Sequence, residues 1–88
     1  DVRDELTAQM KAKVGEIISE IDEQITFHDF RMVSGPTHTN VIFDIVIPYN
    51  YKYSDEEIVS IIADKIHETD DRFFAVIDVD KDFVDHKK

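Results

Sequence analysis

Four side chains between residues 28 and 80 are of the types that bind divalent cations. They are one histidine and three aspartates: His28, Asp44, Asp78 and Asp80. Imidazole nitrogen and carboxylate oxygen suit cations of borderline or hard character, such as manganese, zinc or iron as Mn²⁺, Zn²⁺ or Fe²⁺. The other interpretation is that each aspartate solvates an edge of a sheet and the histidine caps a loop. Which of the two holds depends on the elements that position these residues.

The three aspartates lie in two stretches that alternate like strands, VIFDIVIPY at residues 41–49 and RFFAVIDVD at residues 72–80. Successive side chains of a strand point to opposite faces of the sheet. One face of the two strands is wholly apolar and consists of Val41, Phe43, Ile45, Ile47, Phe73, Ala75, Ile77 and Val79. The aspartates therefore share the opposite face, although aspartate is a poor strand former.

The histidine lies in ITFHDFRMV at residues 25–33, where β-branched and aromatic residues predict another strand. The turn residues SGP at 34–36 follow, so this strand and the next form an antiparallel hairpin. Its alternation is ambiguous, because strict period two places His28 on the same side as Phe30 and Met32. If His28 faces the aspartates, one imidazole and three carboxylates converge.

Two amphipathic helices accompany the strands. The first is predicted over residues 3–22 by an apolar stripe with spacings of four and three, namely Leu6, Met10, Val14, Ile17 and Ile21. The second begins at a capping box of Ser54 and Glu57 and runs to about Glu68. The order α-β-β-α-β predicts an α+β, two-layer, ferredoxin-like or metallochaperone-like domain, with a three-stranded mixed sheet and both helices on one face.

The 88 residues are enough for one small domain, so residues 1–88 are expected to form a single unit. Residues 81–88 are expected to be a frayed tail, in which only Phe83 and Val84 are able to dock. No apolar run reaches the roughly 18–20 residues that cross a bilayer, and no signal-peptide pattern opens the chain. Because the chain begins inside a helical pattern without a methionine, it is expected to be a fragment of a longer protein.

A formal net charge of −10 argues against nucleic acid and against anionic membrane as partners. It is compatible with cation binding and also with simple solubility. No residues are arranged as nucleophile, base and orienting group, and no glycine-rich phosphate loop is present, so neither enzymatic activity nor an organic cofactor is expected. Without cysteine, a thiolate metal site is excluded as well.

The sheet face that carries the aspartates also carries large apolar side chains: Ile42, Val46, Phe74 and Val76. A two-layer domain leaves this face in water, and an exposed apolar patch typically marks a partner surface. We therefore expect a homodimer or docking to another domain. The remaining histidines, His38, His67 and His86, are expected to be solvated surface residues.

The run FHDFRMVSGPTHTNVIFDIVIP, followed by a capped helix and FFAVIDVD, resembles the cytoplasmic C-terminal domain of cation diffusion facilitator transporters. The resemblance covers nearly the whole chain and depends on His28-Asp29-Phe30-Arg31, on the SGP turn and on ADKI at residues 63–66. It implies a domain that dimerises below a six-helix membrane domain in the plasma (inner) membrane. The parent protein would exchange a divalent cation, commonly zinc or manganese, for protons.

The resemblance also implies a set of metal ligands. His28 matches the motif histidine that is a ligand in zinc-binding members, and Asp80 matches an aspartate of the last strand. Asp44 and Asp78 stand where zinc-binding members have histidines, and Ser60 stands where some members have another. Exchanging imidazoles for carboxylates moves the preference towards harder ions.

The resemblance thus predicts a dimer-forming regulatory domain that senses a divalent cation and contacts the transmembrane domain of its own chain. Two alternatives stay open. One is a metal-free dimerisation scaffold of the same transporter. The other is a ferredoxin-like domain that senses a small molecule, although the loop PYNYKYSD lacks the glycine that such domains usually have.

Overall fold

Polar caps define both helices in the computed structural model, which describes residues 1–83. Helix α1 (Val2–Ile21) begins at Asp1, whose carboxylate accepts from the backbone N–H of Asp4. Helix α2 (Asp55–Thr69) begins at the predicted capping box, with the Ser54 hydroxyl and the Glu57 carboxylate each bonded to the backbone of the other residue. These bonds satisfy N–H groups that a helix cannot pair within its own first turn.

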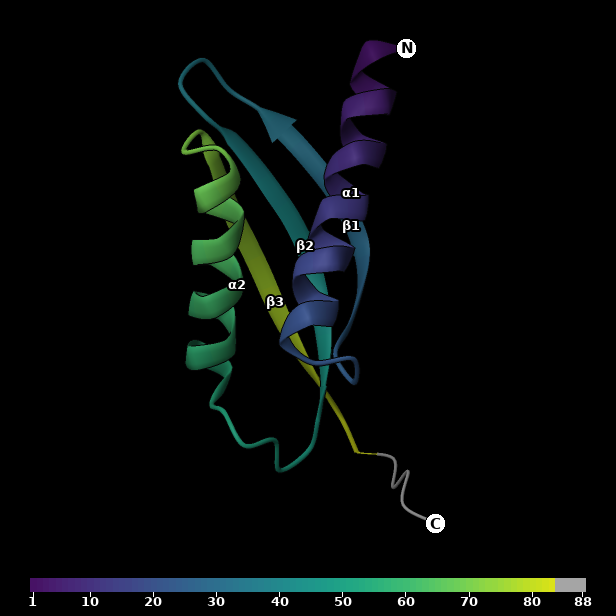
Figure 1. Ribbon diagram of the computed structural model, residues 1–88, viewed down its shortest axis with the longest axis vertical. Helices are drawn as coiled ribbons and strands as arrows, with labels where there is room; N and C mark the ends of the chain where they lie inside the picture. The colour runs from purple at the N-terminus through teal and green to yellow at the C-terminus, as the bar shows by residue number, and fades with distance from the viewer. Residues whose placement is uncertain (84–88) are drawn as a thin grey trace.

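The strands are β1 (Thr26–Ser34), β2 (Thr39–Pro48) and β3 (Phe73–Asp82), in the spatial order β1-β2-β3. Strand β2 is antiparallel to β1 and parallel to β3. Figure 1 shows α1 alongside β1 and α2 alongside β3, so among the residues that the structure describes no helix covers the other face of the sheet. The predicted α+β ferredoxin-like arrangement with a mixed sheet is confirmed.

The core lies between the helices and the sheet. All four inward side chains of β2 are completely buried, and the buried set comprises Met10, Val14, Ile17, Ile18, Ile25, Val41, Phe43, Ile45, Ile47, Ile58, Ile62 and Ile66. Phe43 lies at its centre, with the rings of Phe27 and Phe30 at centroid distances of 5.8 and 6.0 Å. Burying one such side chain contributes about 1.5–3 kcal/mol, so β2 and the two helices, which supply most of the buried side chains, all contribute substantially to stability.

Two predicted details of the apolar surfaces differ. Leu6 was expected in the core, yet it is 53% exposed, whereas Ile18 is buried. Helix α1 packs against both the sheet and α2, so its buried stripe is wider than a single row of residues.

The end of the chain also differs from the prediction. Lys81 and Asp82 were expected to fray, but they continue β3 in register with Ile47 and Pro48. The Lys81 ammonium lies 2.9 Å from Asp55 Oδ1, which ties the end of β3 to the first turn of α2. The rings of Phe83 and Tyr49 pack together with a distance of 4.9 Å between their centroids. Val84 and the rest of the predicted tail lie outside the described residues.

Within residues 1–83, neither helix combines the length and the apolar character that crossing a bilayer requires.

Candidate metal centre

A β-bulge in β1 decides where the histidine points. His28 pairs with Asp44, but the next pair joins Arg31 to Ile42, so Asp29 and Phe30 together lie opposite one residue of β2. Asp29 takes up the extra length with φ 58°, a left-handed conformation that aspartate tolerates better than most residues. The face of each side chain changes after such an insertion.

The bulge therefore separates residues that strict alternation would keep together. His28 lies on the exposed face of the sheet, whereas Phe30 and Met32 pack against the core on the helical face. The placement of His28 beside Phe30 and Met32 was wrong, because period two holds only while each residue has one partner.

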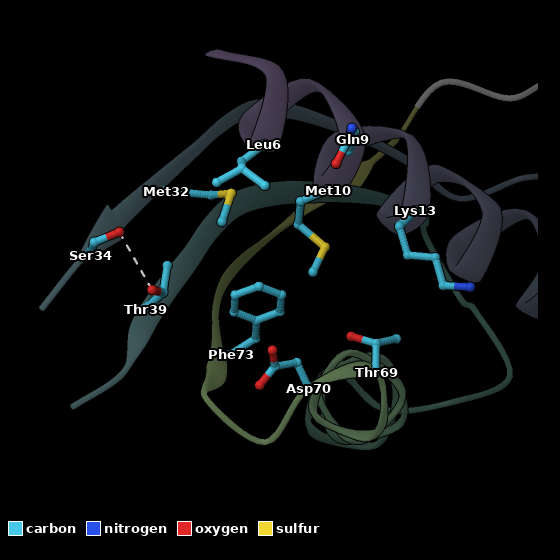
Figure 2. Close-up of a pocket in the computed structure, with 10 residues that line it drawn as sticks. All are labelled: Leu6, Gln9, Met10, Lys13, Met32, Ser34, Thr39, Thr69, Asp70 and Phe73. Atoms are coloured by element: carbon cyan, nitrogen blue, oxygen red, sulfur yellow. Dashed lines mark hydrogen bonds between the residues drawn. The ribbon is translucent and has the colours of Figure 1, made fainter. Parts of the chain in front are cut away.

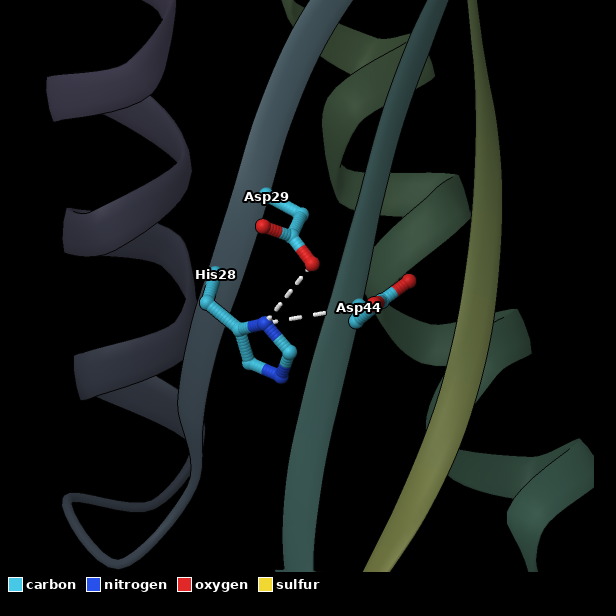
Figure 3. A group of neighbouring side chains, drawn as sticks. All are labelled: His28, Asp29 and Asp44. Atoms are coloured by element: carbon cyan, nitrogen blue, oxygen red, sulfur yellow. Dashed lines mark hydrogen bonds and ion pairs between the residues drawn. The ribbon is translucent and has the colours of Figure 1, made fainter.

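The imidazole of His28 has a carboxylate at each of its nitrogen atoms. Nδ1 lies 3.2 Å from Asp29 Oδ2 and 3.9 Å from Asp44 Oδ2, and Nε2 lies 3.6 Å from Asp80 Oδ2. Figure 3 shows His28 and Asp29 on β1 and Asp44 on β2, with dashed lines joining Nδ1 of the imidazole to each of the two carboxylates. One histidine thus brings together carboxylates from all three strands.

Asp78 lies on the same face of the sheet but outside this set of contacts. It is exposed and is the direct partner of Asp44 in the parallel β2–β3 register. Within residues 1–83 the ion pairs of the cluster run from His28 to Asp29, Asp44 and Asp80 only. The structure therefore brings three of the four predicted ligands into contact and places the fourth beside them.

Asp29 was not predicted as part of this site. It offers a ligand atom in a group with His28 and Asp44 whose ligand atoms all lie within 4.8 Å of one another. In a regularly alternating strand, Asp29 would point to the face opposite His28. Only the bulge turns its carboxylate towards the imidazole. The only hint of its role in the sequence was its position directly after the histidine within a predicted strand.

The spacing of these atoms suits a cation. Bonds of about 2.1 Å from Zn²⁺ to nitrogen and oxygen separate neighbouring ligand atoms by about 3–3.5 Å. At Nδ1 the separations are 3.2 and 3.9 Å, the second within this range after a small side-chain rotation, so one cation there would be shared with Asp29 and Asp44. The separation of 3.6 Å is measured at Nε2, on another edge of the ring, and suits a different cation position shared with Asp80. Asp44 is the most enclosed member of the cluster, and even its side chain is 23% exposed. A cation can therefore reach the cluster directly from solvent.

Negative charge on this face has little local compensation. The Arg31 guanidinium, the nearest cation in sequence, donates through Nη1 to the backbone carbonyl of Asp29 at 2.8 Å and not to a carboxylate of the cluster. Several carboxylates around one imidazole therefore leave an excess of negative charge, which favours a divalent cation.

A second concave region lies on the helical side of the sheet, near the β1–β2 turn. It is a groove of about 410 Å³ whose apolar lining includes Leu6, Met10, Met32 and Phe73, with Lys13 and Gln9 at its rim. Figure 2 shows these side chains between α1 and the ends of the strands. Asp70 is also at this groove, but its carboxylate is paired with Arg72.

Comparison of the chain with protein-family models, curated proteins and solved structures finds no significant match. The function must therefore be inferred from the residues and from their geometry.

Proposed function

We propose that this chain is the cytoplasmic, dimer-forming and metal-sensing regulatory domain of a cation transporter of the cation diffusion facilitator kind. The observation that supports the proposal most is the convergence of His28 with carboxylates from β1, β2 and β3 on the open face of the sheet. Three of these residues, His28, Asp44 and Asp80, are among the ligands that the resemblance to that family implies, whereas Asp29 is not and the implied Asp78 lies beside the cluster.

The donor set indicates which cations to expect. One nitrogen and several carboxylate oxygens favour Mn²⁺ or Fe²⁺ more than a site rich in histidine does, while still accepting Zn²⁺. Asp78 adds a further carboxylate beside Asp44 and would join the ligands after a rotation of its side chain, or bridge to a second copy.

Apolar side chains next to the cluster supply a surface for the second copy. Phe74 and Val76 of β3 are 48% and 47% exposed, and Val33 of β1 is 53% exposed. Large apolar side chains that remain in water on one face are typical of a contact surface. The partners proposed here are a second copy of the domain and the transmembrane part of the same transporter.

The proximity of the two surfaces provides a mechanism of regulation. Without a cation, the carboxylates of two facing copies repel one another and oppose close association. A bound divalent cation neutralises part of that charge and favours the closed dimer, by the difference between its affinities for the two states.

Calorimetric titration of the chain with Mn²⁺ and with Zn²⁺, paired with small-angle scattering, tests the proposal. We expect binding of at least one cation together with a more compact or more fully dimeric particle. Asp44→Asn, which keeps the shape of the side chain, should weaken binding at least about tenfold. Asp71→Asn, which removes an exposed carboxylate from the turn before β3, is the matched control and should bind normally.

Three results would contradict the metal-sensing role. They are the absence of binding, binding that His28→Gln and Asp44→Asn leave unchanged, and a dimer whose dissociation constant does not respond to the cation. The last result, with a stable dimer, would identify a metal-free scaffold.

The groove on the helical side favours one second candidate, a domain that senses a small molecule. Pockets of several hundred Å³ with apolar walls and a few polar groups are typical ligand sites. An amino acid with an apolar side chain would place its carboxylate near Lys13 and its side chain against Met10 and Met32. A thermal-shift screen against the amino acids tests this candidate, with Lys13→Gln expected to remove any shift.

A further inference from the structure

Strand β3 has a backbone edge with which no strand of residues 1–83 pairs. It is the last strand in the order β1-β2-β3 and pairs only with β2. At the two ends of this pairing, the carbonyl oxygens of Arg72 and Asp82 accept from the backbone N–H groups of Thr39 and Tyr49. Because successive residues of a strand direct their backbone groups to opposite sides, the even-numbered residues of β3 bond to β2 and the odd-numbered residues face the open edge.

The open edge therefore presents a regular row of backbone donors and acceptors. At its start, the N–H of Phe73 donates to the carbonyl oxygen of Asp70 at 3.0 Å, and the carbonyl oxygen of Phe73 lies 3.1 Å from His67 Nδ1. Beyond this point, the residues of β3 whose backbone groups face the edge are Ala75, Ile77, Val79 and Lys81. The inward side chains of the first three are only partly buried, whereas those of β2 are completely buried. An added strand would bond to the row and cover these side chains.

The two edges of the sheet differ in how well they can accept a strand. Bulges, prolines and charged side chains are the usual features that prevent pairing at an edge. The edge strand β1 is interrupted by its bulge at Asp29. Strand β3 runs for ten residues in continuous register with β2, without proline or glycine, and the ammonium of its lysine, Lys81, is held by Asp55. The edge of β3 is thus the one suited to further pairing.

The helix layer decides which kind of partner fits at this edge. Helix α2 packs along β3 (Figure 1). A second copy that paired its own β3 antiparallel with this strand would place its α2 over a neighbouring strand only about 5 Å away, whereas packed helices need axes about 8–10 Å apart. A single extended segment brings no helix and avoids this clash. The edge therefore fits one added strand and not a second domain.

The side chains of β3 on the outer face define the chemistry of that strand. Exposed Phe74 and Val76 are followed at the same period by exposed Asp78 and Asp80. Side chains directly opposite one another on neighbouring strands interact, so opposite charges and apolar pairs are favourable there. The formal net charge of −10 also attracts a basic partner from a distance.

We propose that the open edge of β3 binds an extended basic segment of another polypeptide, which adds antiparallel as a fourth strand. Lysine or arginine at alternate positions lies opposite Asp80 and Asp78, and apolar residues at the next alternate positions lie opposite Val76 and Phe74. Main-chain hydrogen bonds supply the affinity in this mode of recognition, and the alternate side chains supply the specificity. The inference goes beyond the proposed function and does not depend on it.

The blocked peptide KTKTVTVT is a suitable probe, because its lysines and valines can lie opposite the aspartates and the apolar residues of β3. Hydrogen exchange followed by NMR, in the presence of EDTA to exclude metal effects, maps the binding. We expect the peptide to slow exchange at the amides of Ala75, Ile77, Val79 and Lys81, whose N–H groups face the edge. No binding, or protection confined to β1 or to the groove on the helical side, would overturn the inference.

Two methylated peptides test the strand pairing without altering the protein. An N-methyl group on the second threonine removes an N–H that faces Ile77 and should weaken binding at least about tenfold. The same group on the valine that follows lies on the side away from β3 and should leave binding unchanged. Equal affinities of the two methylated peptides would overturn the assignment of the edge.

Substitutions of aspartate test the charge complementarity. Asp78→Asn should weaken binding of the peptide about two- to fivefold at low ionic strength, as expected for an exposed ion pair, and added salt should reduce the difference. Asp71→Asn removes an equal charge from the turn before β3 and should bind as the unmodified chain does. The same affinity in both variants would show that the basic residues do not lie opposite Asp78 and would overturn the proposed alignment.

Discussion

His28 and Asp44 lie directly opposite one another in the antiparallel β1–β2 pair, with His28 Nδ1 3.9 Å from Asp44 Oδ2. This pair immediately precedes the bulge, so the imidazole keeps its place on the exposed face while Phe30 and Met32 reach the core. A single inserted residue thus allows β1 to contribute both to the polar cluster and to the apolar interior.

The conformation of Asp29 predicts an unusual pattern of substitution effects. Asp29→Val should lower the free energy of unfolding by about 1–2 kcal/mol, because a β-branched residue is strained at φ 58°. Asp29→Gly should stay within about 0.5 kcal/mol of the unmodified chain in urea unfolding. Equal stability of the valine and glycine variants would show that the bulge is absent or has moved.

Truncation of Phe43 is expected to cause the largest loss of folding stability in the core. Its side chain is completely buried between Phe27 and Phe30, so Phe43→Ala should cost about 3–5 kcal/mol and leave a cavity. Phe74→Ala makes the same chemical change at a half-exposed position of the outer face and should cost much less. Chemical denaturation of the two variants compares them, and similar losses would contradict the assignment of the two faces.

A hydrogen bond between Tyr51 and Asp22 ties the loop before α2 to the end of α1. The Tyr51 hydroxyl, together with the backbone N–H of Gln24, holds the pKa of the Asp22 carboxyl below its usual range. Burial and the bond to Asp22 raise the pKa of Tyr51 to about 12. Tyr51→Phe should lower the free energy of unfolding by about 1 kcal/mol at pH 7, since both groups are partly exposed.

The directions of the two pKa changes define the pH values at which the stability difference between Tyr51→Phe and the unmodified chain disappears. The lowered pKa of Asp22 stabilises the fold above about pH 4, and this contribution is lost as the pH falls through the folded-state value. The raised pKa of Tyr51 stabilises the fold below about pH 10, and this contribution is lost as the pH rises through about 12. Denaturation across this range should show the difference between the variants shrinking at both ends, and a constant difference would contradict the pairing.

Asp70 and Arg72 form a local ion pair at the end of α2. The guanidinium donates to the Asp70 carboxylate at 3.1 and 2.8 Å, and the backbone N–H of Arg72 donates at 2.9 Å. These bonds lower the pKa of Asp70 to about 2. Arg72→Gln should raise that pKa towards the ordinary value, as measured by NMR titration of the carboxyl carbon.

Arg3→Gln provides the control, since it removes the same charge near the start of α1. The Asp70 titration should be unaffected by it. If both variants gave the same pKa for Asp70, the general charge of the domain and not the ion pair would be the cause.

Local patterns in the sequence were sufficient to predict the order of helices and strands. Ser54 and Glu57 identify the start of α2 because the capping box is an interaction of neighbouring residues. Alternation alone separates the buried side chains of β2 from Asp44, because the extra residue of the bulge lies in β1 and leaves the alternation of β2 unbroken. The shared face of Asp44, Asp78 and Asp80 follows from the same rule.

Contacts between distant segments decided what those patterns left open. The burial of Ile18 depends on the angle at which α1 meets both α2 and the sheet, and the extra length of β3 depends on the pairing of Lys81 with Ile47. Neither relationship is encoded by neighbouring residues, because each arises from packing between elements far apart in the chain.

The amino-acid sequence by itself determined the α-β-β-α-β order, the apolar core face and the presence of one imidazole and several carboxylates able to share the other face. Only the tertiary structure decided that Asp29 belongs with them and which atoms approach one another. The physical reason is the bulge, where Asp29 adopts φ 58° and Phe30 still reaches the core. An inserted residue without a glycine leaves no mark in a period-two pattern, and it becomes visible only when β1 is paired with β2.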